Sequence, residues 1–172
     1  MTRQAIVFVI ALASDVQCAI ADEAADAVQV LSTVWKGTFD YGSTSQFVGD
    51  SKTFKMQTVT RSSDGTVSVL TSEAPFRYLE SPDTFPSYLG ATCLPERGCI
   101  FVRCLFDRDC IVQEQVTYDP VYQDPKLKGT AYFKRSEEGG AVKPADADNV
   151  KRALRTLMRL NAAPPFDPSA PR

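Results

Sequence analysis

Large apolar side chains recur at every second position in several segments of the chain, and this period of two is typical of half-buried β-strands. Trp35 and Phe39 share one such face, which predicts a long strand over residues 31–41. The following residues, 42–51, are mostly polar and predict a loop. The first part of the chain after residue 30 is therefore expected to enter a sheet.

A hairpin is predicted where Asp64-Gly65 separates two alternating segments, because this dipeptide favours a two-residue turn. Such a turn pairs Thr60 with Val69. It also places Phe54 and Val67 on the same face of the sheet.

A second hairpin is predicted around residues 107–109, with Cys99–Phe106 and Cys110–Tyr118 as its strands. In the latter strand, Val112 and Val116 suggest the face that points to the core, and Glu114 falls on the same face. A further strand is expected over Gly129–Lys134, and a loop over residues 136–144.

One amphipathic helix is predicted over residues 148–161, where apolar side chains recur at helical spacing. They are Val150, Ala153, Leu154, Leu157 and Met158. The expected fold class is α+β: a mostly antiparallel sheet, or a partly closed small barrel, with one C-terminal amphipathic helix. Residues 162–172 are proline-rich and predict a disordered tail.

The N-terminus has the pattern of a secretory signal peptide, in which a basic start precedes an apolar run and a small-residue cleavage site. These three parts are Arg3, Ala5–Ala13 and Ala19–Ala21. The apolar run is too short to span a bilayer, which argues against a membrane anchor. We therefore predict a signal peptide at 1–21, a single β-rich domain at 22–161, no transmembrane segment, and a periplasmic or extracellular location.

The cysteines agree with export, because four remain after removal of Cys18 and an even number in an exported chain predicts two disulfides. They are Cys93, Cys99, Cys104 and Cys110. Their spacing favours the pairs 93–99 and 104–110, while the crossed pairs 93–104 and 99–110 stay open. The spacing is not that of a zinc site.

The chain has no histidine, which excludes Ser-His-Asp and Cys-His nucleophilic sites and histidine metal ligands. The net charge of −2 gives no sign of a nucleic-acid partner. We expect neither a metal ion nor a cofactor. The sequence favours a non-enzymatic binding module that is an inhibitor of, or a partner for, a secreted or envelope protein.

Three groups of residues are candidates for contacts with a protein or a cell-envelope component. Glu96 and Arg97 lie in the loop that a 93–99 disulfide would close, and Tyr118 and Tyr122 lie in a turn-rich connector. The predicted helix adds a basic face, although the acidic segment 22–26 is able to neutralise it within the molecule. The basic residues of this face are Lys151, Arg152, Arg155 and Arg159.

Two other functions are kept as alternatives. The first is a carrier for a small apolar ligand, with a cavity lined by Trp35, Phe39, Phe54 and Val67. The second is a carboxylate-based hydrolase, for which Glu114 would act as the acid.

Overall fold

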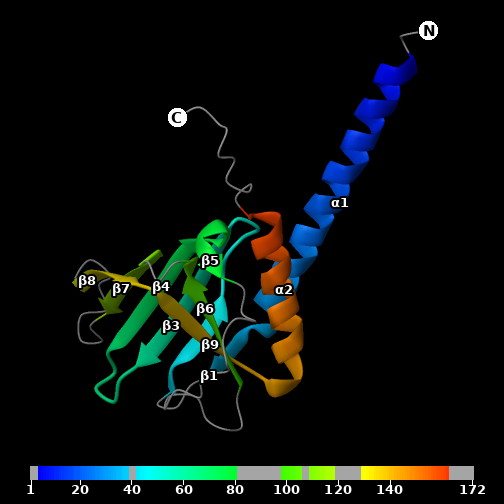
Figure 1. The fold of residues 1–172 in the computed structure, drawn as a ribbon. Helices are drawn as coiled ribbons and strands as arrows, with labels where there is room; N and C mark the ends of the chain where they lie inside the picture. Colours follow the sequence, from blue (N-terminus) through cyan, green and yellow to red (C-terminus); the bar gives the residue numbers. More distant parts are fainter. Residues whose placement is uncertain (1–3, 39–41, 81–97, 106–108, 119–128, 163–172) are drawn as a thin grey trace.

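The computed structural model describes residues 4–38, 42–80, 98–105, 109–118 and 129–162, with the backbone alone described at residues 4–18 and 98–99. The fold is α+β, with two antiparallel sheets and a helix near each end of the chain (Figure 1). The described strands do not close into a barrel. Of the two predicted architectures, the structure therefore has the open antiparallel sheet and not the partly closed barrel.

The larger sheet has six strands in the order β1-β2-β3-β4-β7-β8, and every neighbouring pair is antiparallel. Their bounds are β1 Lys36–Thr38, β2 Thr44–Phe47, β3 Thr53–Arg61, β4 Val67–Pro75, β7 Ile111–Tyr118 and β8 Gly129–Arg135. The strands β1 and β8 are thus the two edges of this sheet.

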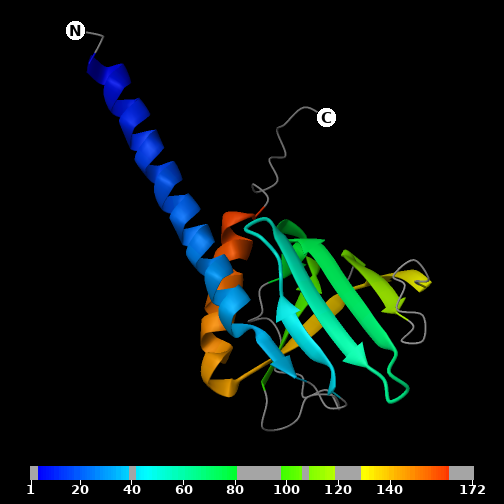
Figure 2. The ribbon, with the colours of Figure 1, turned by 180° about the vertical axis from the view of Figure 1, so that it is seen from behind.

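The smaller sheet has three strands in the order β5-β6-β9. Their bounds are β5 Leu79–Glu80, β6 Gly98–Cys104 and β9 Glu137–Val142, and the short 3₁₀ helix η2, Phe76–Tyr78, precedes β5. The strand β9 runs across the inner face of the larger sheet (Figure 2). Glu138 contacts side chains of β4 and β7, and Gly140 approaches Met56 of β3.

The two long helices are α1, Gln4–Val34, and α2, Ala147–Leu160, which follows the 3₁₀ helix η6, Pro144–Asp146. The last turns of α1 lie beside α2, whereas its first turns project away from the sheets (Figure 1). Among the helices in the described ranges, none is both long and apolar enough to cross a membrane.

A core of aromatic and aliphatic side chains fills the space between the sheets and the helices. Trp35 is fully buried, stacks on Phe47 at 6.3 Å between ring centroids, and tilts against Phe54 at 5.9 Å. The predicted helix is confirmed, because its five predicted core residues are all buried on α2. They are Val150, Ala153, Leu154, Leu157 and Met158.

The strand predicted over residues 31–41 is wrong in its first half. Leu31 is a buried residue of α1, and the strand β1 begins only at Lys36. Leu31 and Trp35 are spaced equally well for a helix and for a strand, so α1 packing against α2 decides the structure there. The predicted loop at 42–51 contains β2, and its Phe47 belongs to the core.

The first predicted hairpin forms, but its register differs by one residue from the prediction. Thr60 pairs with Ser68, not with Val69. The reason is the turn, in which Ser62 pairs with Thr66 and Gly65 adopts a left-handed conformation with φ +87°, giving three turn residues instead of two. A shift of one residue exchanges the faces of a strand.

The second predicted hairpin does not form, because its two strands belong to different sheets. β6 pairs with β5 and β9, whereas β7 pairs with β4 and β8. In β7 the core face was also predicted wrongly, since Ile111 is buried and Val112 is exposed.

The core face of β7 was predicted wrongly because the polar residue Gln113 is buried on the same face as Ile111. Its amide donates hydrogen bonds to Ser72 Oγ, at 3.0 Å, and to the Glu138 carboxylate. The loop predicted over 136–144 contains β9, whose glycines allow the strand to lie close to the core.

Candidate functional site

The strand β8 is an edge of the larger sheet and is exposed on both of its faces. It pairs with β7 from Ile111↔Arg135 to Thr117↔Gly129, and no described strand pairs with its other side. Each of its seven residues, Gly129–Arg135, is exposed. The backbone groups on the outer side of β8 are therefore open to another extended chain.

Aromatic side chains lie on both faces of this edge. Tyr132 is 69% exposed and Phe133 is 45% exposed, and they point to opposite faces because they are neighbours in a strand. Val112 of β7, which is 47% exposed, pairs with Lys134 on the same face as Tyr132. Exposed apolar side chains therefore gather at β8 and its neighbour.

The charge of this edge is positive. Lys134 and Arg135 end β8, and neither forms an ion pair within the described part of the chain. In the sequence, Lys126 and Lys128 precede the strand, and no acidic residue occurs between positions 126 and 135. Residues 130–133, in the middle of the strand, carry no charge, so the positive charge of β8 lies at its C-terminal end.

The hydroxyl of Tyr132 donates a hydrogen bond of 3.1 Å to Glu114 of β7. This bond and the negative charge of Glu114 raise the pKa of Tyr132, because both disfavour its ionised form. The bond holds the exposed ring of Tyr132 over β7. Glu114 is a half-buried strand residue with a tyrosine partner on the outer face of the sheet.

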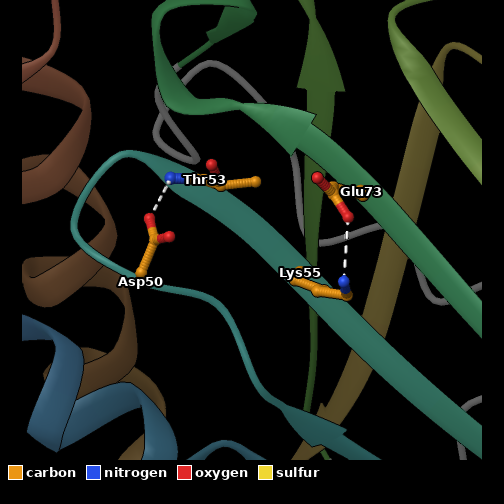
Figure 3. Close-up of polar contacts among 4 residues, drawn as sticks. All are labelled: Asp50, Thr53, Lys55 and Glu73. Carbon is orange, nitrogen blue, oxygen red and sulfur yellow. Dashed lines mark hydrogen bonds and ion pairs between the residues drawn. The ribbon is translucent and has the colours of Figure 1, made fainter.

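A shallow depression of about 410 Å³ adjoins Tyr132 on the outer face of the sheet. On its far side, Lys55 of β3 and Glu73 of β4 form a cross-strand ion pair of 2.9 Å (Figure 3). The residues that line it are Lys55, Thr71, Glu73, Pro75, Cys110, Val112, Glu114 and Tyr132. The depression is large enough to receive a side chain of another molecule.

The end of β8 is held by a covalent corner of the fold. Cys104, at the end of β6, forms a disulfide with Cys110, which precedes β7. The backbone N–H of Cys104 donates a hydrogen bond of 2.7 Å to the carbonyl of Ser136, the residue between β8 and β9. The disulfide and this hydrogen bond connect the end of β6, the start of β7 and the end of β8. They therefore restrict the motion of this end of β8.

The observed Cys104–Cys110 disulfide confirms one of the preferred pairs and excludes the crossed pairing, which would join Cys104 to Cys93. Cys93 lies outside the described residues, and at Cys99 only the backbone is described. The second disulfide, 93–99, stays a prediction.

The basic face predicted on α2 is partly neutralised within the molecule. Arg159 forms an ion pair with Glu23 of α1, one of the acidic residues expected to have this role. Lys151 is half-buried, whereas Arg152 and Arg155 are exposed.

The predicted apolar cavity is not assembled as expected. Trp35 and Phe54 are fully buried against each other, and Val67 lies on the opposite face of the sheet from Phe54 because of the shifted register. Phe39 lies outside the described residues.

Of the remaining candidates, Tyr118 is half-buried at the end of β7, opposite Val67 of β4. Glu96, Arg97 and Tyr122 lie outside the described residues. Among the described candidates, Glu114 contacts Tyr132 of β8, and Cys110 lines the depression beside it.

The predictions missed Tyr132, Phe133, Lys134 and Arg135. A signal was present, since two adjacent aromatic residues followed by two basic residues lie in a segment predicted as a strand. What the sequence lacked was the position of that strand at an edge.

In the described ranges, no group of three or more Cys, Asp or Glu side chains is arranged to hold a metal ion. Comparison of the chain with protein-family models, with curated proteins and with solved structures found no match.

Proposed function

We propose that this chain is an exported, non-enzymatic module that binds a protein by adding one extended, acidic segment of that protein to strand β8. The observation that carries this proposal is the exposure of all seven residues of an edge strand, Gly129–Arg135. Main-chain hydrogen bonds along such an edge supply affinity, and side-chain contacts supply specificity.

The side chains of β8 indicate the chemistry of the partner. Lys134 and Arg135 favour carboxylates in the added strand, and Tyr132 and Phe133 offer apolar surface on its two faces. Aromatic residues and arginine are the residue types that most often dominate binding energy at protein interfaces. A secreted or envelope protein with an exposed acidic strand or terminus has the required properties.

Cleavage after Ala21 is compatible with the core contacts described for α1, which come from the second half of this continuous helix. Among the described side chains, every α1 residue in or against the core follows Ala21, and these residues begin at Ala24. The first turns of the helix project away from the folded body (Figure 2). Removal of residues 1–21 would therefore leave the described core contacts in place.

The partner chemistry is tested with a synthetic peptide of about eight alternating Glu and Val residues, a length close to that of the strand it would join. Binding is measured by fluorescence anisotropy, and amide hydrogen exchange shows where the peptide lies. We expect slower exchange in β8, and weaker binding at higher salt concentration. A peptide with Gln in place of Glu is the control for charge and should bind more weakly.

Two variants test the residues of the edge. Exchanging both Lys134 and Arg135 for Gln should weaken peptide binding about fivefold, because an exposed charge pair contributes on the order of 0.5 kcal/mol. Tyr132→Ala should weaken it by about fivefold or more, because it removes the aromatic contact proposed on this face of the edge. The matched control exchanges for Gln the two exposed lysines Lys36 of β1 and Lys143, which follows β9, at the far end of the larger sheet from β8. Equal loss in both double variants, or peptide protection confined to other strands, would contradict the proposal.

Export is tested separately by isolating the protein from cells that produce it. We expect recovery from the periplasm or medium, an N-terminus at Asp22, and oxidised cysteines. Recovery from the cytosol with Met1 retained and free thiols would contradict the exported location.

A further inference from the structure

A groove of about 640 Å³ lies at the opposite end of the larger sheet from β8, where β1, β2 and β3 meet the end of β9. The strands β1 and β9 approach each other closely there, since a Cβ added to Gly37 of β1 would lie 2.8 Å from the Cβ of Ala141 of β9. The described residues that line the groove are Lys36, Gly37, Thr38, Thr44, Ser45, Gln46, Gln57, Val59, Ala141, Val142, Lys143 and Pro144. Its volume is in the range of small-molecule sites.

The charge of the groove is positive. Lys36 comes from β1 and Lys143 follows β9, so two distant parts of the sequence each contribute one ammonium group. Both lysines are exposed, and neither forms an ion pair within the described ranges. The described residues that line the groove include no acidic side chain. An anionic group entering the groove would therefore meet two ammonium groups that no described side chain neutralises.

The uncharged lining is rich in hydrogen-bonding groups. Thr38 and Thr44 are exposed and pair with each other across β1 and β2. The amide nitrogen of Gln46 donates a hydrogen bond of 3.4 Å to the amide oxygen of Gln57, which leaves the other atoms of both amides available. These groups suit a ligand that carries many hydroxyls.

We propose that this groove is a binding site for a short acidic saccharide that carries carboxylate groups. The two lysines bind the carboxylates, the threonine and glutamine side chains bind the sugar hydroxyls, and Val59 and Pro144 contact the C–H faces of the rings. The site is independent of β8, so the saccharide and the protein partner are able to bind at the same time.

The proposal is tested by isothermal titration calorimetry with a short oligogalacturonate. A neutral malto-oligosaccharide of the same length and inorganic phosphate are the comparison ligands. We expect measurable binding of the oligogalacturonate, at least tenfold weaker binding of the neutral saccharide, and no competition from phosphate at equal concentration. Chemical-shift changes in an NMR titration should cluster at β1, β2 and the end of β9.

Variants assign the roles of the residues. Lys36→Gln and Lys143→Gln should each weaken oligogalacturonate binding about threefold to tenfold and leave the unfolding midpoint unchanged, because both side chains are exposed. Exchange of Lys134 and Arg135 for Gln is the matched control and should leave saccharide binding unchanged.

Several results would overturn the proposal. They are equal affinity for the acidic and neutral saccharides, displacement of the saccharide by equimolar phosphate, and unchanged binding in the two groove lysine variants. Loss of saccharide binding in the β8 control variant to the same extent would also overturn it. None of these results bears on peptide binding at β8, which is measured with a different ligand.

Discussion

Gly140 allows β9 to lie directly on the aromatic core, and this contact can be tested by a single added methyl group. A Cβ at this position would lie 2.6 Å from Trp35 Nε1 and 2.9 Å from Met56 Cε. Non-bonded carbon atoms prefer about 3.5–4.0 Å, so an atom at the Trp35 contact must move by roughly 1 Å. The Met56 side chain is flexible and is able to yield, but the indole is fixed between Phe47 and Phe54.

We expect Gly140→Ala to lower the free energy of unfolding by about 2 kcal/mol, the middle of the range for an overpacked core. The matched control is Gly129→Ala, where an added Cβ would meet nothing within 4 Å and where no positive φ requires glycine. The control should change stability by less than about 0.5 kcal/mol, as is usual for an exposed site.

The assay is urea unfolding followed by the fluorescence of Trp35, which is the only tryptophan of the chain. With a denaturant slope of about 2 kcal/mol per molar, the midpoint of Gly140→Ala should fall by about 1 M. The slope itself should not change if both proteins unfold in one step. If the two alanine variants had the same midpoint, the close approach of β9 to Trp35 would be refuted.

Two further predictions concern the Cys104–Cys110 disulfide and the outer face of the sheet next to β8. Cys110→Ser should lower the free energy of unfolding by about 2.4 kcal/mol, which is the chain-entropy value for a disulfide that closes so short a loop. Urea unfolding without reductant measures this loss, and an unchanged midpoint would show that the disulfide does not constrain the unfolded chain. Glu114→Gln should lower the pKa of Tyr132 toward about 10, because it removes the carboxylate that disfavours the ionised tyrosine, and an NMR pH titration of the ring measures the change. A Tyr132 pKa that did not fall would exclude Glu114 as the cause.

The helix α2 was predictable because its evidence is local. Five apolar residues at helical spacing define a buried face whatever packs against it, and all five are buried. The antiparallel strands from Thr53 to Thr71 were predictable for the same reason. Their register was not, since it depends on whether Gly65 ends a two-residue or a three-residue turn.

The buried polar residues explain the wrong core face of β7. Val112 and Val116 suggested that their face points inward, but Gln113 occupies the inner face with Ser72 and Glu138 as partners. A sequence pattern assigns polar residues to solvent because burial of an unpaired polar group is costly. It has no access to partners that come from other strands and remove that cost.

The β8 edge and the groove beside β1 could not be predicted from the sequence, because both depend on how strands are arranged in space. Edge strands have no distinct local pattern, so the exposure of Tyr132 and Phe133 on both sides of β8 followed only from the strand order of the sheet. Lys36 and Lys143 are brought to one groove only because β9 crosses the inner face of the larger sheet and ends beside β1.

The sequence by itself determined the class of the fold, the final helix, most of the strands and the preferred pairing of Cys104 with Cys110. These features depend on side-chain periodicity and on the short reach of a disulfide, which act over a few neighbouring residues. Only the tertiary structure decided which strands share a sheet, which face of β7 is buried, and which surfaces are open to a partner. Those outcomes depend on contacts between residues far apart in the chain, and such contacts are established only when the whole core packs.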